Sequence, residues 1–229
     1  GANLFVRVND EYTSLTPYTS ANDGNLYYLD VNFGSVAERR IELVGSQFMF
    51  GGCWIGATDS INPPQMRGPL GIVVGDSITE GTGWLAAGSA LGFVQAASEY
   101  CGWDDLRASG VGATGYLQAP DPKKKLRDRL ATDVFAYNPQ LVVFTAGIND
   151  GAFTYAQVLA EVLACIDATA AALPNAAIVV SSPLRSAGVS YASDGQLATY
   201  KAVRDACAAR PSVLYMDLWR LRTANVAPT

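Results

Sequence analysis

Three residues of this chain, Ser77, Gly112 and Asn149, have types and positions that could support chemistry together. A serine hydroxyl can act as a nucleophile, while free backbone N–H groups and a side-chain amide can donate hydrogen bonds to a developing oxyanion. Acyl transfer requires these groups, so the three residues are candidates for one site. Each also has a structural interpretation: Ser77 as a helix cap, Gly112 as a residue with positive φ, and Asn149 as part of an Asx turn.

Apolar runs before these residues predict the strands that would position them. Continuous apolar runs occur at residues 72–74 and 141–144, as in strands buried on both faces, and residues 105–108 form a shorter candidate strand. The carboxyl ends of parallel strands lie along one edge of a sheet, so the loops that follow can converge there. These loops are residues 75–77, 108–115 and 145–150.

Strands and helices alternate along the chain after residue 72. This alternation predicts an α/β fold with a doubly wound parallel sheet and right-handed crossovers. Predicted helices cover residues 85–100 and 122–135, and capping boxes at residues 154–157 and 193–196 begin two more, with further strands at residues 177–180 and 213–216.

The first part of the chain predicts β structure instead. Short apolar segments separated by polar turns indicate a small antiparallel β-sandwich or jelly-roll-like domain. A segment with two adjacent prolines, residues 59–71, predicts a connector, and we place the domains at residues 1–62 and 63–229. The predicted N-terminal strands are residues 4–8, 26–31, 40–44, 48–50 and 53–55.

Charge and hydropathy exclude several classes of partner. The net charge of −5 argues against nucleic acid and anionic membrane surfaces as partners. No uninterrupted apolar run approaches the roughly 20 residues of a membrane span. One basic cluster repeats with leucines at helical spacing, which predicts the solvated face of an amphipathic helix rather than a phosphate site. The cluster consists of Lys123, Lys124, Lys125, Arg127 and Arg129.

Cysteines and histidines limit the metal and redox chemistry of the chain. The four cysteines, Cys53, Cys101, Cys165 and Cys207, form no C-x-x-C pair and their spacing specifies no disulfide, so buried free thiols are expected. None of the 229 residues is a histidine. A histidine metal site or a complete Ser-His-Asp triad is therefore excluded within this sequence, and we expect neither a metal nor a cofactor.

The sequence does not contain a convincing form of two familiar motifs. Gly110, Gly112 and Gly115 match G-x-G-x-x-G, but two prolines follow where a dinucleotide fingerprint would open a helix, so we do not expect a dinucleotide cofactor. The G-x-S-x-G elbow of the α/β-hydrolases is absent from the sequence.

The three loops in this order resemble the first three sequence blocks of the GDSL/SGNH hydrolases. The resemblance covers roughly residues 70–220 and is carried by Gly75-Asp76-Ser77-Ile78, the Gly112 loop and Gly147-Ile148-Asn149-Asp150. It implies a flavodoxin-like parallel sheet and hydrolysis of acyl esters. Ser77 would be the nucleophile, and the Ser77 N–H, the Gly112 N–H and the Asn149 side chain would form the oxyanion hole.

The same resemblance extends to the small β domain. This arrangement is similar to carbohydrate esterase family two, whose members deacetylate polysaccharides, and similar modules occur in phage tail proteins. It implies an ester substrate, such as an acetylated polysaccharide or another acylated small molecule, and an extracellular or virion-associated location.

The chain departs from the family at the general base, because the expected D-x-x-H block has no counterpart in a sequence without histidine. We expect the polypeptide to continue past Thr229 and to supply the base there. The alternative is a catalytically degenerate module that binds carbohydrate or a surface within a larger extracellular or phage tail protein.

Overall fold

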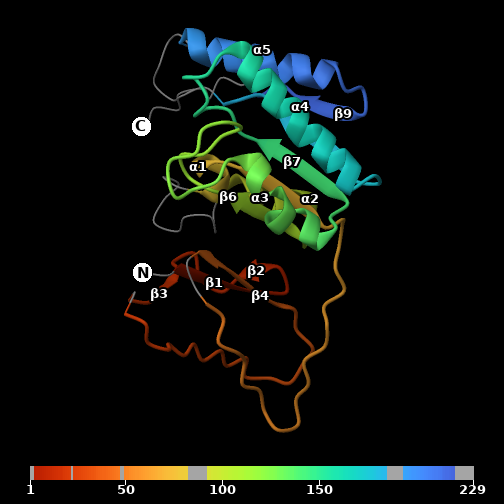
Figure 1. Cartoon of the computed structure of the whole chain (residues 1–229). Coiled ribbons are helices and arrows are strands. Elements are labelled where there is room, and N and C mark those ends of the chain that lie inside the picture. The colour runs from red at the N-terminus through yellow and green to blue at the C-terminus, as the bar shows by residue number, and fades with distance from the viewer. Residues whose placement is uncertain (1–2, 22, 47–48, 82–91, 185–192, 220–229) are drawn as a thin grey trace, which may run out of the picture.

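The computed structural model describes residues 3–21, 23–46, 49–81, 92–184 and 193–219, which form two sheets of different kinds (Figure 1). A five-stranded sheet has the order β6-β5-β7-β8-β9, with every neighbouring pair parallel. This order, 2-1-3-4-5 in chain sequence, is that of flavodoxin-like proteins, so the predicted fold class is confirmed. Its strands are β5 (Gly71–Gly75), β6 (Leu106–Gly110), β7 (Leu141–Thr145), β8 (Ala177–Ser181) and β9 (Val213–Met216).

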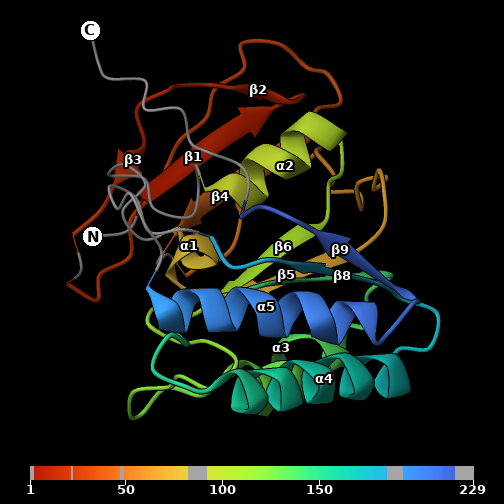
Figure 2. The same cartoon turned by 90° about the horizontal axis from the view of Figure 1, so that it is seen from above.

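Helices cover both faces of the parallel sheet. Figure 2 shows α3, α4 and α5 on one face and α2, with the N-terminal sheet beyond it, on the other. The capping boxes at Thr154 and Ser193 are both formed and begin α4 and α5, as predicted. The helices are α1 (Ser77–Glu80), α2 (Phe93–Cys101), α3 (Leu126–Asp133), α4 (Tyr155–Ala172) and α5 (Asp194–Ala208), with a 3₁₀ turn at Phe135–Tyr137.

The main core lies between the sheet and the α3–α5 layer. Phe144 from β7 and Val158 from α4 are fully buried there, together with Val203 from α5. Burial of an aliphatic side chain contributes roughly 1.5–3 kcal/mol, so this layer stabilises the sheet whose strand ends carry the loops. The helix predicted from residue 85 is described only from Phe93, and its first part lies outside the described residues.

Among the described residues, α4 is the one helix whose length and composition would allow it to cross a membrane. It packs instead against α5 and the sheet, and it buries Val162 and Ile166 in the core. Glu161 on the same helix forms ion pairs with Lys125 and Arg127. The helix therefore has the contacts of a core helix.

The N-terminal part contains one small antiparallel sheet in its described residues. Its central strand, β1, pairs with the other three strands. The predictions at residues 4–8 and 40–44 are confirmed by β1 and β4. The strands are β1 (Asn3–Val8), β2 (Glu11–Tyr12), β3 (Tyr18–Thr19) and β4 (Ile41–Ser46).

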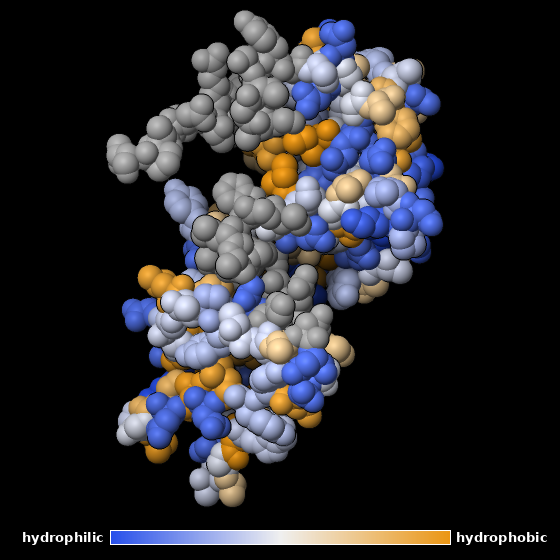
Figure 3. All heavy atoms as spheres, turned by 90° about the vertical axis from the view of Figure 1, so that its left-hand side faces the viewer, coloured by the Kyte–Doolittle hydropathy of each residue, from blue (hydrophilic) through white to orange (hydrophobic). Residues whose placement is uncertain are grey.

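The strands predicted at residues 26–31 and 53–55 are wrong, because these segments are irregular; so are residues 49–50, while residue 48 lies outside the described residues. The expected second layer of a sandwich is thus not formed by the described residues. Apolar side chains of these segments are exposed, including Leu26 (74%) and Trp54 (76%). Figure 3 shows hydrophobic atoms on the surface of this part of the molecule, at the bottom. Strand propensity requires neighbours to pack against, and these segments have few.

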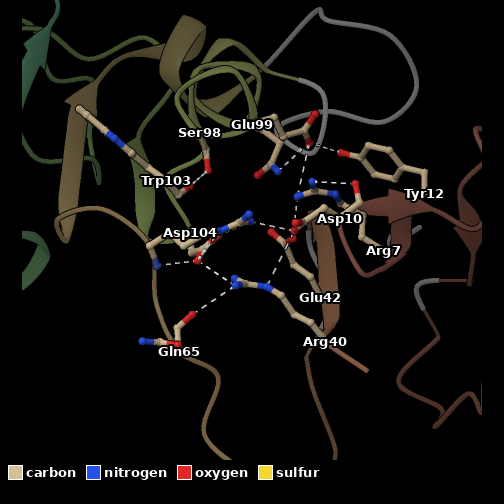
Figure 4. Close-up of polar contacts among 12 residues, drawn as sticks. Arg7, Asp10, Tyr12, Arg40, Glu42, Gln65, Ser98, Glu99, Trp103 and Asp104 are labelled. Atoms are coloured by element: carbon tan, nitrogen blue, oxygen red, sulfur yellow. Dashed lines mark hydrogen bonds and ion pairs between the residues drawn. The ribbon is translucent and has the colours of Figure 1, made fainter. Parts of the chain in front are cut away.

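Ion pairs join the N-terminal sheet to the α/β part. Asp104, just after α2, has a side chain only 5% exposed and accepts hydrogen bonds from Arg40 and Arg67. A second cluster joins Glu99 of α2 to Tyr12 and Arg7 (Figure 4). The division at residue 62 stays a prediction, and residues 49–70 between the sheets form no helix or strand.

The four cysteines are all free thiols, as expected from a spacing that specifies no disulfide. Cys165 and Cys207 are buried as expected, but Cys53 and Cys101 are exposed. The expectation of burial is wrong for these two because one lies in an irregular segment and the other at the end of α2.

Candidate active site

Ser77 is the first residue of α1, directly after the buried strand β5. Asp76 caps this short helix, its carboxylate accepting a hydrogen bond from the Ile78 N–H at 2.9 Å. Gly75 has no room for a side chain, since a Cβ there would overlap the Thr79 hydroxyl and lie 2.5 Å from the Thr145 carbonyl oxygen. The glycine thus lets α1 pack tightly onto the end of the sheet. Ser77 itself is partly exposed to solvent.

Three strands end at the same level beside this serine. Gly75 of β5 is aligned with Gly110 of β6 and with Thr145 of β7. The loops that carry Gly112 and Asn149 therefore leave the sheet next to the Ser77 turn, as predicted for the carboxyl edge of a parallel sheet.

Gly112 faces Ser77. A Cβ built on Gly112 would lie 3.6 Å from the Ser77 Cβ and 2.5 Å from the Glu80 carboxylate oxygen. The next residue, Ala113, has a φ of 63°, a left-handed conformation that is unusual for a residue with a side chain. A glycine at position 112 therefore leaves the space between this loop and α1 free of a side chain.

Asn149 is tied to the same loop. Its side-chain amide donates a hydrogen bond to the Thr114 carbonyl oxygen at 2.8 Å, and the Thr114 hydroxyl donates to the Val111 carbonyl. The structure thus brings all three predicted residues to one place. Their individual chemical roles stay predictions.

Asp150, the residue after Asn149, positions the neighbouring loop, a role that its place in the sequence does not predict. It is fully buried, and its carboxylate accepts hydrogen bonds from the backbone N–H groups of Tyr116, Leu117 and Gln118 at 2.8–2.9 Å. The segment that follows the Gly112 loop is thereby anchored to the Asn149 loop. The sequence offers no signal for this role, because the three donors are backbone groups 32–34 residues away.

The basic cluster forms the predicted solvated face only in part: Lys123, Lys124 and Arg127 are exposed, but Arg129 is not. Arg129 is only 4% exposed and lies against the strand ends. Lys123 donates a hydrogen bond to the Gly112 carbonyl oxygen at 2.6 Å. Lys125 and Arg127 pair with Glu161. The prediction is wrong for Arg129, because α3 begins only at Leu126 and the Arg129 guanidinium binds the Gly75 and Ser109 carbonyl oxygens at the strand ends.

Asp76, the residue before Ser77, is a buried carboxyl group with a shifted pKa. Burial raises the pKa of its carboxyl to about 6, and the charge of Asp150 contributes in the same direction. The hydrogen bond from the Ile78 N–H and the charge of Arg129 oppose this rise. The described residues contain no group of three His, Cys, Asp or Glu side chains arranged to hold a metal ion.

The sheet order and the converging loops define a doubly wound α/β protein with its site at the carboxyl edge. The model of the GDSL-like lipase/acylhydrolase family matches residues 73–227, and the chain belongs to that family. No curated protein sequence matches the chain.

Two solved structures share the fold over nearly the whole chain. A family two carbohydrate esterase from Cellvibrio japonicus is 16% identical, with a TM-score of 0.70 over 94% of this chain and 72% of that one. Another from Clostridium thermocellum, in complex with cellohexaose, is 17% identical, with a TM-score of 0.62 over 95% and 76%. At these identities the likeness shows the fold, which includes the N-terminal part.

Proposed function

We propose that this protein is a serine esterase that cleaves acyl esters of carbohydrates, with Ser77 as its nucleophile. The observation that carries the proposal is the close approach of Gly112 to Ser77, where an added Cβ would lie 3.6 Å from the Ser77 Cβ, with Asn149 bound to the same loop. The three residues follow separate strands, and together they place a partly exposed hydroxyl beside backbone and side-chain N–H groups.

In the proposed reaction, the Ser77 oxygen attacks the ester carbonyl carbon and its proton passes to a base. The Ser77 N–H, the Gly112 N–H and the Asn149 amide donate hydrogen bonds to the resulting oxyanion. The alkoxide leaves with a proton from the conjugate acid of that base, and water then cleaves the acyl-serine by the reverse proton path. One donor of this kind typically contributes about 10²–10³ in kcat.

The base is the missing component, because none of the 229 residues is a histidine. The proposal therefore includes a histidine that lies outside these residues. Loss of the base from a Ser-His pair costs about 10⁶ in kcat, so we expect negligible esterase activity from the 229 residues alone.

The carbohydrate part of the proposal is supported by the fold. Both family two carbohydrate esterases match this chain through its N-terminal part as well as through the parallel sheet. The acidic chain, with a net charge of −5, suits a neutral polymer better than an anionic one.

The test is the reaction of Ser77 with a 4-nitrophenyl phosphonate, with imidazole added as an external base. A Ser77–phosphorus bond forms, 4-nitrophenolate leaves and imidazole takes the serine proton. We expect a single phosphonyl adduct at Ser77 whose rate rises with imidazole, no adduct in S77A, and a normal rate in S60A, which alters an exposed serine. A folded chain that never forms the adduct would overturn the proposal.

The absence of histidine also favours a second candidate, a module that binds carbohydrate without cleaving it. Its signature is saturable binding of an acetylated polysaccharide together with failure of the imidazole-assisted reaction at Ser77. Phosphonylation of Ser77 would instead show that the nucleophile is functional and that these residues lack only the base.

A further inference from the structure

Arg129 connects two strand ends from the far side of the sheet. Its guanidinium donates hydrogen bonds to the Gly75 carbonyl oxygen at 2.6 Å and to the Ser109 carbonyl oxygen at 2.9 Å. It also donates to the Ser109 hydroxyl and pairs with Asp133. Its side chain is 5% exposed, so these bonds form in a region of low dielectric constant, where they are strong.

The two carbonyl groups belong to the strands that carry the proposed site. Gly75 is followed by Asp76 and Ser77, and Ser109 is followed by the segment that leads to Gly112. The Gly75 carbonyl also accepts the Val111 N–H at 3.1 Å. One guanidinium thus binds the carboxyl ends of β5, which precedes Ser77, and of β6, which precedes Gly112.

The packing around this point leaves no room for adjustment. A Cβ on Gly110 would overlap the backbone of Glu80 and lie 2.5 Å from the Thr79 carbonyl carbon, so α1 touches the β6 backbone directly. If β5 and β6 separated, α1 would move relative to the Gly112 loop, because no flexible side chain lies between them.

We propose that Arg129 is a positioning residue that holds β5 and β6 together and thereby sets the spacing between Ser77 and the Gly112 N–H. This inference rests on the proposed function for its catalytic meaning, whereas the contact between the strands does not depend on it. The planar, forked guanidinium is required, since a single ammonium group cannot reach both carbonyl groups with the same geometry.

The test compares R129K and R129M with R127M in the full chain. Arg127 lies on the same helix, is 43% exposed and shares its partner Glu161 with Lys125, so R127M removes a charge without touching the strand ends. The first readout is the imidazole-assisted phosphonylation of Ser77, from which we obtain the maximal rate and the phosphonate concentration that gives half of it. The second is hydrogen exchange of the Val111 and Gly112 amides.

We expect R129K and R129M to lower the maximal rate about 100-fold with an unchanged half-saturating concentration, since a small misplacement of reacting groups costs this much. Exchange at Val111 should be at least about tenfold faster in both, whereas R127M should match the wild type in both readouts. Equal rates and equal exchange in R129K and R127M would overturn the inference.

Failure of the proposed function and failure of a variant to fold can each be distinguished from failure of this inference. If the wild-type chain forms no adduct, the proposed function fails, and exchange at Val111 decides the positioning role alone. If R129M does not fold, R129K decides, because it keeps the buried charge.

Discussion

Gly115 and Asp150 are in direct contact, such that a Cβ on Gly115 would lie 2.6 Å from the carboxyl carbon of Asp150. The backbone of the glycine-rich loop can therefore approach the carboxylate only where there is no side chain. This close approach lets the carboxylate reach the three N–H groups of the following residues. The pair fixes the shape of the loop that carries Gly112.

Changing either partner should destabilise the fold. G115A introduces an overlap with a buried carboxylate, and D150N replaces an acceptor with a donor that faces N–H groups. We expect each to lower the free energy of unfolding by roughly 2–3 kcal/mol, measured by urea denaturation. The exposed D30N is the matched control and should change it by less than about 0.5 kcal/mol. A D150N variant as stable as D30N would contradict the anchoring role of Asp150.

The raised pKa of Asp76 predicts a pH dependence of stability. Burial raises this pKa to about 6 from an ordinary value of 3.8, so the folded state binds a proton more tightly than the unfolded state. Stability should therefore fall as the pH rises from about 4 to about 6, and the penalty should remain above that range. D76N keeps a capping side chain and removes the ionisation, so it should be more stable than the wild type at pH 7 by up to about 3 kcal/mol.

The measurement is urea unfolding of both proteins between pH 4 and pH 7.5. The difference between D76N and the wild type should grow across the predicted window and then level off. A constant difference at every pH would show that Asp76 has an ordinary pKa in the folded protein.

Asp104 should control the attachment of the N-terminal sheet. Although burial raises the pKa of this carboxyl, hydrogen bonds from Arg67 and Arg40 dominate and lower it to about 2. Hydrogen bonds to charged groups contribute about 1.5–3 kcal/mol when buried and less where, as at Arg67, the partner is half exposed. We expect D104N to speed hydrogen exchange in β4 by about tenfold and to leave β7 unchanged.

The control for this variant is D105N, at the neighbouring position. Asp105 pairs with the exposed Arg107 on the surface of the α/β part. Exchange in β4 that responds equally to D104N and D105N would contradict a specific role for Asp104.

The α/β part was predictable because its signals are local. Residues 72–74 and 141–144 are continuous apolar runs, and the structure places them in β5 and β7. Thr154 and Ser193 cap their helices through residues three positions away, a relation that the sequence displays directly. The N-terminal segments at residues 26–31 and 53–55 have a similar composition, but a strand also needs a partner strand, which composition does not supply.

Some residues of the candidate site could likewise be predicted from the sequence, and others could not. Ser77, Gly112 and Asn149 could be selected from residue type and from their positions after strands, and parallel topology explains why their loops meet. Arg129 could not be selected, because a charged residue in a short helix has the sequence pattern of a solvated side chain.

The amino-acid sequence by itself determined which segments become strands and helices of the parallel sheet, and which polar loops follow them, since apolar runs, caps and glycines act within a few residues. Only the tertiary structure decided that Arg129 is buried and that Asp150 anchors the glycine-rich loop. Two partners of Arg129 are backbone carbonyl groups 20 and 54 residues away, and those of Asp150 are amides 32–34 residues away. Every residue carries such groups, so only the folded chain distinguishes the ones that are left to bind a buried charge.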